Sequence, residues 1–274
     1  MTDDAPNPFS RQSFLGADSQ KLIEQCVVGL VGLGGGGSHI VQQLAHLGFL
    51  NYVVFDADRI EETNLNRLVG ATQQDVAEAR LKVEIARRMI LGIRPKAVVE
   101  TVAEVWQKRP EALKRCDVVF GGVDSFDQRR QLEITTRRYL IPLIDVGMDV
   151  VVMPGSPPEI SGQVILSMPG EPCMTCMGFL REKALAREAG KYGDAGHAPQ
   201  VVWSNGVLAS SAVGLLVDLL TDWSQSLRAR RYLCYRGSIG TVTPHVRLDY
   251  LGDETCHHFP LEKCGDPKFR PLMT

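Results

Sequence analysis

The feature that most constrains the fold of this chain is a glycine-rich loop between a predicted strand and a predicted helix. Residues 26–34, CVVGLVGLG, form a short, valine-rich apolar run, as expected of a parallel strand buried on both faces. Residues 38–48 then have the apolar spacing of a helix, for which Gly48 is a suitable C-terminal cap. A strand, a glycine loop and a helix in this order indicate the first unit of a parallel α/β sheet.

Strand-like and helix-like segments continue to alternate along the chain. Strand-like runs lie at residues 52–58, 97–102, 116–124 and 141–151, and helical spacing occurs at residues 79–92 and 127–140. We therefore predict an α/β fold with a doubly wound, mostly parallel, Rossmann-like sheet. Such sheets bind ligands beyond the carboxyl ends of their strands.

The pattern changes beyond Pro154. Isolated strand-like segments at residues 159–168 and 241–248 flank a helical segment at residues 207–220. We expect these strands to extend the sheet formed by the first half.

The 274 residues contain no linker, repeat or low-complexity segment, so we predict a single domain over residues 1–274. Residues 1–150 would form its nucleotide-binding half and residues 151–274 its substrate-facing half. The net charge of -2 gives no basic surface of the kind that nucleic-acid-binding proteins show, so we expect no nucleic-acid partner.

The first ten residues lack the basic and apolar regions of a secretory signal, which predicts a cytoplasmic location. The longest apolar stretch, residues 207–220, is too short to span a bilayer and contains Asp218. We expect a buried helix there and no membrane partner.

The glycine loop predicts a nucleotide site. Gly32, Gly34, Gly35 and Gly37 would let a nucleotide approach the backbone and the N-terminus of the helix. Asp56, at the end of the next predicted strand, is placed to accept hydrogen bonds from a ribose hydroxyl. Taken alone, this pattern fits an NAD-dependent dehydrogenase equally well.

The polar residues downstream of the loop distinguish these two interpretations. A dinucleotide pyrophosphate is largely satisfied by the loop and the helix dipole, whereas a reacting triphosphate requires basic side chains and a carboxylate that holds a metal ion. The candidates in chain order are Asp56, Asp58, Asn64, Arg67, Lys82 and Asp124. Their chemistry and order favour ATP.

These segments resemble the motifs of a known family, the ThiF/MoeB-like adenylating enzymes, which include the nucleotide-binding half of ubiquitin-activating enzymes. The similar segments are SRQSFLG, VGLGGGGS, FDADRIEETNLNR, RLKVEIA, FGGVDSFDQR and EPCMTC. The resemblance extends from about residue 11 to residue 265, and several motifs in the same order are far more specific than any one of them.

The resemblance implies roles for individual residues. Arg11, supplied by the partner in a homodimer, would neutralise the phosphates of ATP together with Arg67 and Lys82. Asn64 would add a hydrogen bond, and Asp124 would coordinate Mg2+.

The reaction that the resemblance implies is adenylation of the C-terminal carboxylate of a ubiquitin-like or sulfur-carrier protein with a Gly-Gly tail. A carboxylate is already ionised at neutral pH, so positioning and electrostatics should supply most of the acceleration. Three alternatives stay open: adenylation of a peptide or tRNA-bound carboxylate, a non-catalytic dimer subunit, and a nicotinamide dehydrogenase.

Four of the seven cysteines form two pairs that predict a structural Zn2+ site. The predicted ligands are Cys173, Cys176, Cys256 and Cys264. The second pair has a longer spacing than the usual Cys-x-x-Cys, so His257 or His258 could replace one sulfur. The alternative is a set of thiols without metal.

The other cysteines, Cys26, Cys116 and Cys234, lie in or beside apolar runs and are predicted to be core residues. Many members of the family carry a further cysteine before the long helix, yet residues 177–206 contain none. We therefore expect the enzyme to stop at the acyl-adenylate, with a conjugating enzyme or sulfurtransferase completing the transfer. Recruitment of a core or zinc-bound cysteine is the alternative.

Overall fold

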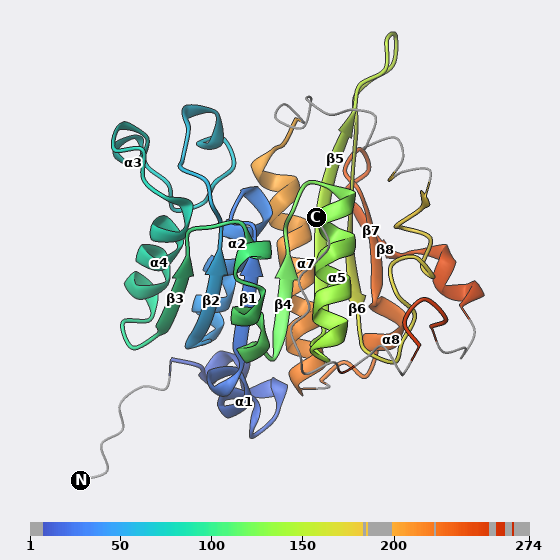
Figure 1. The fold of residues 1–274 in the computed structure, drawn as a ribbon, viewed down its shortest axis with the longest axis horizontal. Coiled ribbons are helices and arrows are strands. Elements are labelled where there is room, and N and C mark those ends of the chain that lie inside the picture. The colour runs from blue at the N-terminus through green and yellow to red at the C-terminus, as the bar shows by residue number, and fades with distance from the viewer. Residues whose placement is uncertain are drawn as a thin grey trace.

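The computed structural model describes residues 8–182, 185, 199–221, 223–251, 256–260 and 265 (Figure 1). These residues form an eight-stranded sheet with the strand order β3-β2-β1-β4-β5-β6-β7-β8. The strands are β1 Val27–Val31, β2 Asn51–Phe55, β3 Val98–Val102, β4 Val118–Gly121, β5 Leu143–Val151, β6 Glu159–Ser167, β7 Tyr232–Arg236 and β8 Thr241–Pro244. The chain is therefore a mixed α/β protein with a Rossmann-like sheet, as predicted.

The sheet has a parallel part and an antiparallel part. Strands β3, β2, β1, β4 and β5 pair in parallel, and β1 is the central strand at which the strand order reverses. Strands β6, β7 and β8 continue the sheet in antiparallel fashion. The second half of the chain thus extends the sheet of the first half.

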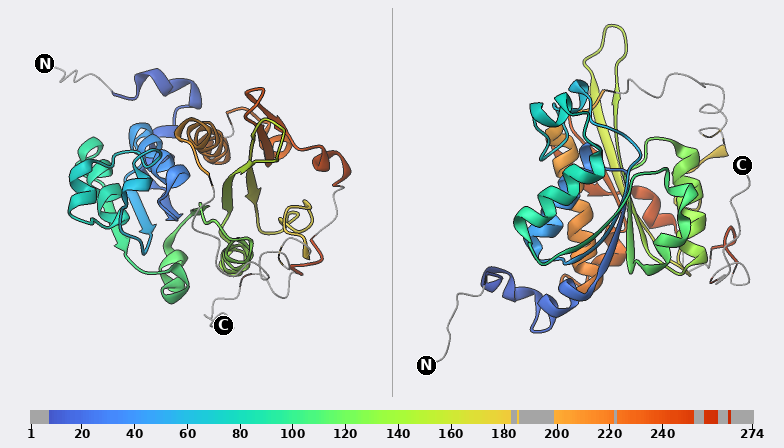
Figure 2. Two further views of the ribbon diagram at one scale, coloured as in Figure 1. Left: turned by 90° about the horizontal axis from the view of Figure 1, so that it is seen from above. Right: turned by 60° about the vertical axis from the view of Figure 1, so that its left-hand side comes forward.

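Helices cover both faces of the sheet, as the right-hand view of Figure 2 shows. One face carries α2 (Gly35–Leu47), α4 (Lys82–Ile93) and α7 (Val202–Thr221), whose buried residues form one large apolar cluster with the strands. The other face carries α5 (Phe126–Arg138), which contributes Leu132 to a second cluster. Shorter segments complete the described chain: η1 Ser10–Leu15, α1 Ser19–Gln25, η2 Glu62–Asn64, α3 Gln73–Ala77, η3 Trp106–Lys108, η4 Pro110–Arg115, α8 Leu227–Arg230 and η6 Val246–Tyr250.

Helix α7 is 20 residues long and, by length and composition alone, is apolar enough to cross a membrane. It contacts α2, β5 and β6, and residues such as Leu208, Leu215 and Leu216 along it are fully buried. This packing is that of a core helix, as predicted for residues 207–220.

Several boundaries differ from those expected from the sequence, and one strand was not expected. The strand expected over residues 241–248 ends at Pro244, because residues 246–250 form η6. The helix expected over residues 79–92 begins at Lys82, because Ala79 adopts a left-handed conformation with φ of 46° and cannot belong to it. Strand β7 was not predicted. Its five residues, YLCYR, are too few and too mixed to give a clear alternating signal.

The parallel strands all end at the same edge of the sheet. In Figure 1 this is the upper edge, beyond which the β5–β6 hairpin projects. Segments η1 and α1 lie at the opposite, lower edge.

Candidate active site

The glycine loop connects β1 to α2 and is tightly packed. Gly32 has φ of +91°, and a Cβ there would lie 2.5 Å from the carbonyl oxygen of Gly122, in the segment that follows β4. A Cβ on Gly37 would lie 2.1 Å from the Gly32 carbonyl oxygen. Side chains at these positions would push the loop away from the sheet, so glycine is required at both.

The N-terminus of α2 is open to a ligand. Its N-cap, Gly34, has no side chain to accept hydrogen bonds from the first backbone N–H groups of the helix. These groups and the helix dipole favour an anion at this point.

Asp56, which follows β2, fastens the loop. Its Oδ2 accepts a hydrogen bond of 2.7 Å from the Leu33 amide, and its Oδ1 accepts one of 2.9 Å from the Asp58 amide. Burial raises the pKa of the Asp56 carboxyl, while the positive charge of Lys82 and both amides act in the opposite direction. The carboxylate therefore holds the loop in place at the edge of the sheet.

Two basic side chains reach the same region from segments after β2. Lys82, the first residue of α4, donates a 2.7 Å hydrogen bond to Asp58, and its side chain is only 12% exposed. Arg67 donates from Nη1 to the Thr63 carbonyl oxygen at 2.6 Å and to Asn66 Oδ1 at 3.0 Å. Both cations are thus anchored by neighbouring oxygen atoms.

Asp124 supplies an exposed carboxylate between β4 and α5. The next residue, Ser125, caps α5 by accepting a 3.0 Å hydrogen bond from the Gln128 amide. The cap fixes the backbone at the start of the helix, which holds Asp124 at the wall of the site.

These residues surround one cavity of about 710 Å³ at the carboxyl edge of the sheet. Its volume lies within the range of roughly 300–1,000 Å³ that is usual for ligand sites. Of the residues predicted from the sequence, the structure brings together Gly32, Gly34, Gly35, Asp56, Asp58, Arg67, Lys82 and Asp124 around it.

Three predicted site residues do not line the cavity. Gly37 is buried beneath the loop. The Asn64 side chain closes the turn of η2 by accepting a 3.2 Å hydrogen bond from the Glu61 amide. Arg11 lies in η1, at the opposite edge of the sheet (Figure 1).

The cavity also has walls that were not singled out from the sequence. On the side of β3 they include Trp106, whose buried Nε1 has no hydrogen-bond partner among the described residues. On the side of β5 they include Arg129, Gln163 and Asn205. Arg129 lies in the first turn of α5, five residues after Asp124, and this closeness in the sequence is the signal that could have identified it.

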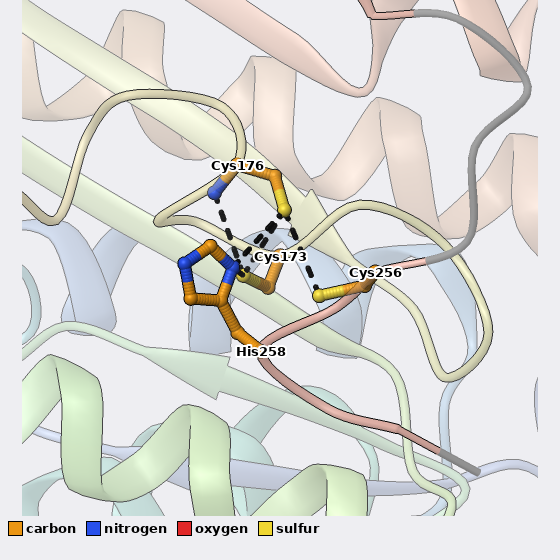
Figure 3. A group of neighbouring side chains, drawn as sticks. All are labelled: Cys173, Cys176, Cys256 and His258. Carbon is orange, nitrogen blue, oxygen red and sulfur yellow. Dashed lines mark hydrogen bonds between the residues drawn. The ribbon is translucent and has the colours of Figure 1, made fainter.

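A Cys/His cluster lies apart from this cavity. The ligand atoms of Cys173, Cys176, Cys256 and His258 are all within 4.8 Å of one another (Figure 3). The Cys176 sulfur is 3.7 Å from the Cys173 sulfur and 3.6 Å from the Cys256 sulfur, and His258 Nδ1 is 3.3 Å from the Cys176 sulfur. Cys264 lies outside the described residues.

The spacing of these atoms fits a tetrahedral metal site. With a Zn–S bond of about 2.3 Å, tetrahedral geometry places two sulfurs about 3.8 Å apart, whereas a disulfide requires about 2.05 Å. Three thiols and one imidazole are a usual donor set for a structural zinc ion.

A buried polar network supports the loop that carries the first two cysteines. Glu133 accepts hydrogen bonds from the Ser167 hydroxyl at 2.5 Å and from the Met174 amide at 2.8 Å. Arg137 donates to the Ser167 hydroxyl and to the Pro172 carbonyl oxygen. The network therefore ties α5 and β6 to the residues on both sides of Cys173.

The order of the strands, the helices on both faces and the glycine loop after β1 define a doubly wound α/β protein of the Rossmann type. Within that class, the model of the ThiF family matches residues 9–250. The chain belongs to the ThiF family.

Several curated proteins are similar in sequence. The SAMP-activating enzyme E1 of Haloferax volcanii is 31% identical over 165 residues, which cover 60% of this chain and 57% of that protein. The sulfur carrier protein adenylyltransferase of Thermus thermophilus is 28% identical over 180 residues, 62% of each chain. Ubiquitin-like modifier-activating enzyme 5 of Drosophila mojavensis is 26% identical, over 95% of this chain and 64% of that protein. The chain spans less than two thirds of each of these relatives.

Solved structures share the fold. The crystal structure of E. coli MccB with ATP superposes with a TM-score of 0.69 at 20% identity, covering 89% of this chain and 73% of that one. The crystal structure of PaaA gives a TM-score of 0.65 at 20% identity, covering 88% of this chain and 84% of that one.

Proposed function

We propose that this chain uses ATP to adenylate the C-terminal carboxylate of a ubiquitin-like or sulfur-carrier protein, giving an acyl-adenylate and pyrophosphate. The observation that carries the proposal is the convergence of Lys82, Arg67 and Asp124 on the cavity that the glycine loop borders. The names of the archaeal and bacterial relatives support the kind of partner.

The chain's own residues would bind and orient the nucleotide. Asp56 would accept hydrogen bonds from the ribose, and the open N-terminus of α2 would hold a phosphate. Lys82 and Arg67 would stabilise the charge that develops on pyrophosphate as it leaves. Hydrogen bonds to Asp58 and to the Thr63 carbonyl oxygen hold the two cations at the cavity, which would limit the reorganisation needed at the moment of reaction.

Asp124 fits a Mg2+ site, since Mg2+ is usually held by one or two carboxylates together with substrate phosphates and water. When bound, Mg2+ would supply charge neutralisation for the phosphates. The exposed Asp124 carboxylate would fix the position of the Mg2+ ion in the cavity.

The Cys/His cluster is proposed to bind one structural Zn2+ through Cys173, Cys176, Cys256 and His258. The spacing of the four ligand atoms supports His258 as the fourth ligand, in place of Cys264. Such an ion would link the segment after β6 to the C-terminal part of the chain.

The transfer step is assigned to a partner protein, a conjugating enzyme or sulfurtransferase. Burial raises the pKa of the Cys26 and Cys116 thiols to about 12 and raises that of Cys234, which leaves all three poor nucleophiles at neutral pH. Residues 177–201, which lie between Cys176 and α7, contain no cysteine.

A homodimer is proposed because the η1 segment, which contains Arg11, lies at the edge of the sheet opposite the cavity (Figure 1), and Arg11 does not line the cavity of its own chain. Phe14, on the same η1 segment, is 69% exposed and packs edge-on against the half-exposed Trp223 with ring centroids 5.7 Å apart. Exposed aromatic side chains beside Arg11 suit a surface that a partner subunit covers.

One continuous sheet built from both halves supports a single domain over residues 1–274. A cytoplasmic location is also proposed, because thiols stay reduced there and can bind zinc.

The experiment that tests this function is ATP–pyrophosphate exchange, run with and without a ubiquitin-like protein that ends in Gly-Gly. We expect pyrophosphate exchange only when the Gly-Gly-ended protein is present. ATP binding without exchange for any carboxylate would favour the non-catalytic subunit.

A second candidate function is adenylation of a peptide carboxylate. It is favoured by the fold shared with MccB, whose structures include complexes with ATP and with MccA. Exchange stimulated by short peptides but not by a folded Gly-Gly protein would select it.

A further inference from the structure

A buried arginine stands at one end of the cavity, and the proposed nucleotide contacts do not use it. Arg129 of α5 lines the cavity although the residue is only 6% exposed. Asp56 follows β2, whereas Arg129 contacts β5. Strands β1 and β4 lie between β2 and β5, so the distance from β2 to β5 across the sheet is about 14 Å. Arg129 therefore lies well away from the expected ribose position.

The guanidinium of Arg129 is held by one of its two ends. Its Nη1 donates to the carboxylate of Asp145, which is fully buried in β5, and to the Val146 carbonyl oxygen at 3.2 Å. The ring of Phe179 lies 5.9 Å from its central carbon. In the described part of the chain, Nη2 donates no hydrogen bond, so this end is available to a ligand.

The backbone beside the guanidinium is kept free of side chains. A Cβ on Gly147 would lie 2.7 Å from Arg129 Nη2 and 2.3 Å from the amide nitrogen of Gln163. Gly147, Arg129 and Gln163 all line the cavity. Glycine at position 147 thus leaves room for the guanidinium to face the cavity.

The same region borders the N-terminus of α2, where the proposed function places a phosphate of ATP. A Cβ on Gly36, at the start of α2, would contact a methyl group of Val146 at 3.9 Å. Val146 is the residue whose carbonyl oxygen accepts from Arg129. Lys82 and Arg67 approach from the segments after β2, on the other side of the loop. An anion held at the loop would therefore have these two cations on one side and Arg129 on the other.

We propose that Arg129 binds the reacting carboxylate of the acyl substrate, an inference that rests on the proposed adenylation. One carboxylate oxygen forms a bond to the α-phosphorus, and the bond from this phosphorus to the bridging oxygen breaks. Pyrophosphate leaves with that electron pair, and no proton is transferred. Arg129 Nη2 donates to the other carboxylate oxygen, which becomes the carbonyl oxygen of the mixed anhydride.

This placement has a chemical advantage. In-line displacement requires the nucleophile and the leaving group on opposite sides of phosphorus. The buried Asp145 carboxylate already fixes the Arg129 guanidinium. Arg129 can therefore orient the substrate carboxylate without an entropic cost for ordering its own side chain. A chain end without a free carboxylate could not form this ion pair with Arg129, so it would bind less well.

The test compares binding of two nucleotides by calorimetry. The compound 5′-O-(N-glycylsulfamoyl)adenosine mimics a glycyl-adenylate, whereas AMP lacks the acyl group. We expect Arg129→Met to weaken binding of the glycyl compound about 10- to 100-fold, the loss typical of a hydrogen bond to a charged group. AMP binding should change by less than about threefold. Arg130→Met, which removes an exposed charge from the next position of α5, should alter neither.

The single substitution leaves Asp145 buried without its partner and could prevent folding. The double variant Arg129→Met/Asp145→Leu removes the whole pair, and it is judged by the same two affinities. Arg129 would lose its proposed role if either folded variant kept the wild-type preference for the glycyl compound. If wild-type protein bound ATP but preferred AMP to the glycyl compound, both this inference and the proposed adenylation would be overturned.

Discussion

The ammonium group of Lys82 lies 2.7 Å from the carboxylate of Asp58, across the turn between β2 and α4. Lys82 is mostly buried, whereas the Asp58 side chain is 68% exposed. The pair therefore holds a cation at the cavity wall while leaving its carboxylate partner in water. A triphosphate that enters the cavity could take over the ammonium group, because the exposed Asp58 carboxylate would stay hydrated when the pair separates.

Replacement of Lys82 should weaken ATP binding. We expect Lys82→Met to raise the Kd for ATP about 10- to 100-fold, because one charge-assisted contact with phosphate is lost. Arg87→Met removes an exposed positive charge from the same helix and serves as the matched control. Equal affinities of the two variants, measured by calorimetry, would show that Lys82 does not contact the nucleotide.

Zinc removal should lower stability more than activity. Elemental mass spectrometry should find one zinc ion per wild-type chain. The Cys173→Ser variant should lack this ion and unfold at a lower Tm. Pyrophosphate exchange at low temperature should persist, because the cluster lies apart from the cavity. Cys234→Ser, outside the cluster, should keep the metal.

The fourth ligand can be assigned separately. The position of His258 predicts that His258→Gln loses most of the zinc, whereas Cys264→Ser retains it. The reverse result would favour four cysteines.

Acid should destabilise the chain through Asp75. Arg88 donates to both oxygens of this buried carboxylate, at 2.6 and 2.8 Å, and holds the pKa of Asp75 well below its usual value. A depressed native pKa adds stability above the unfolded-state pKa of about 4, and this stability is lost as the pH falls below it. Because Arg88 is partly exposed, we expect Asp75→Asn to lose only about 1–3 kcal/mol at pH 7.

Urea unfolding at pH 7 and at pH 3 provides the measurement for Asp75. The difference in unfolding free energy between wild type and Asp75→Asn should shrink at the lower pH. A difference that is independent of pH would indicate that packing alone explains the loss.

Much of this site could be predicted from the sequence because its residues lie next to strand ends. The glycine loop and Asp56 directly follow short apolar strands, Asp124 follows one after two residues, and parallel strands bring their carboxyl ends together. Arg129 and Gln163 could not be predicted in this way. Gln163 lies in the antiparallel strand β6, and the register of β5 and β6 brings it to the cavity. Arg129 lies within α5, and it reaches the cavity through the packing of this helix against β5.

The fourth ligand of the Cys/His cluster shows another limit of the sequence. Cys256, His257, His258 and Cys264 offered several combinations, and spacing alone left them open. In the structure His258 joins the three cysteines, with its Nδ1 3.3 Å from the Cys176 sulfur (Figure 3), whereas His257 is not a member of this cluster.

Mixing two inactive variants tests whether Arg11 acts across a dimer. Arg11→Ala and Asp124→Ala should each abolish exchange. After unfolding and refolding together, about a quarter of wild-type activity should return, because half of the dimers are mixed and each has one intact site. No recovery from mixed dimers, isolated by two different affinity tags, would mean that Arg11 does not complete the partner's site.

The central claim is that ATP is cleaved at the α-phosphorus by a carboxylate. The most direct measurement incubates the chain with ATP, Mg2+, a Gly-Gly-ended carrier protein and hydroxylamine, which traps an activated carboxyl as a hydroxamate. We predict a C-terminal hydroxamate and an equal amount of pyrophosphate for wild type, and neither for Asp124→Ala. Release of ADP and orthophosphate, or an equal yield from Asp124→Ala, would contradict the account.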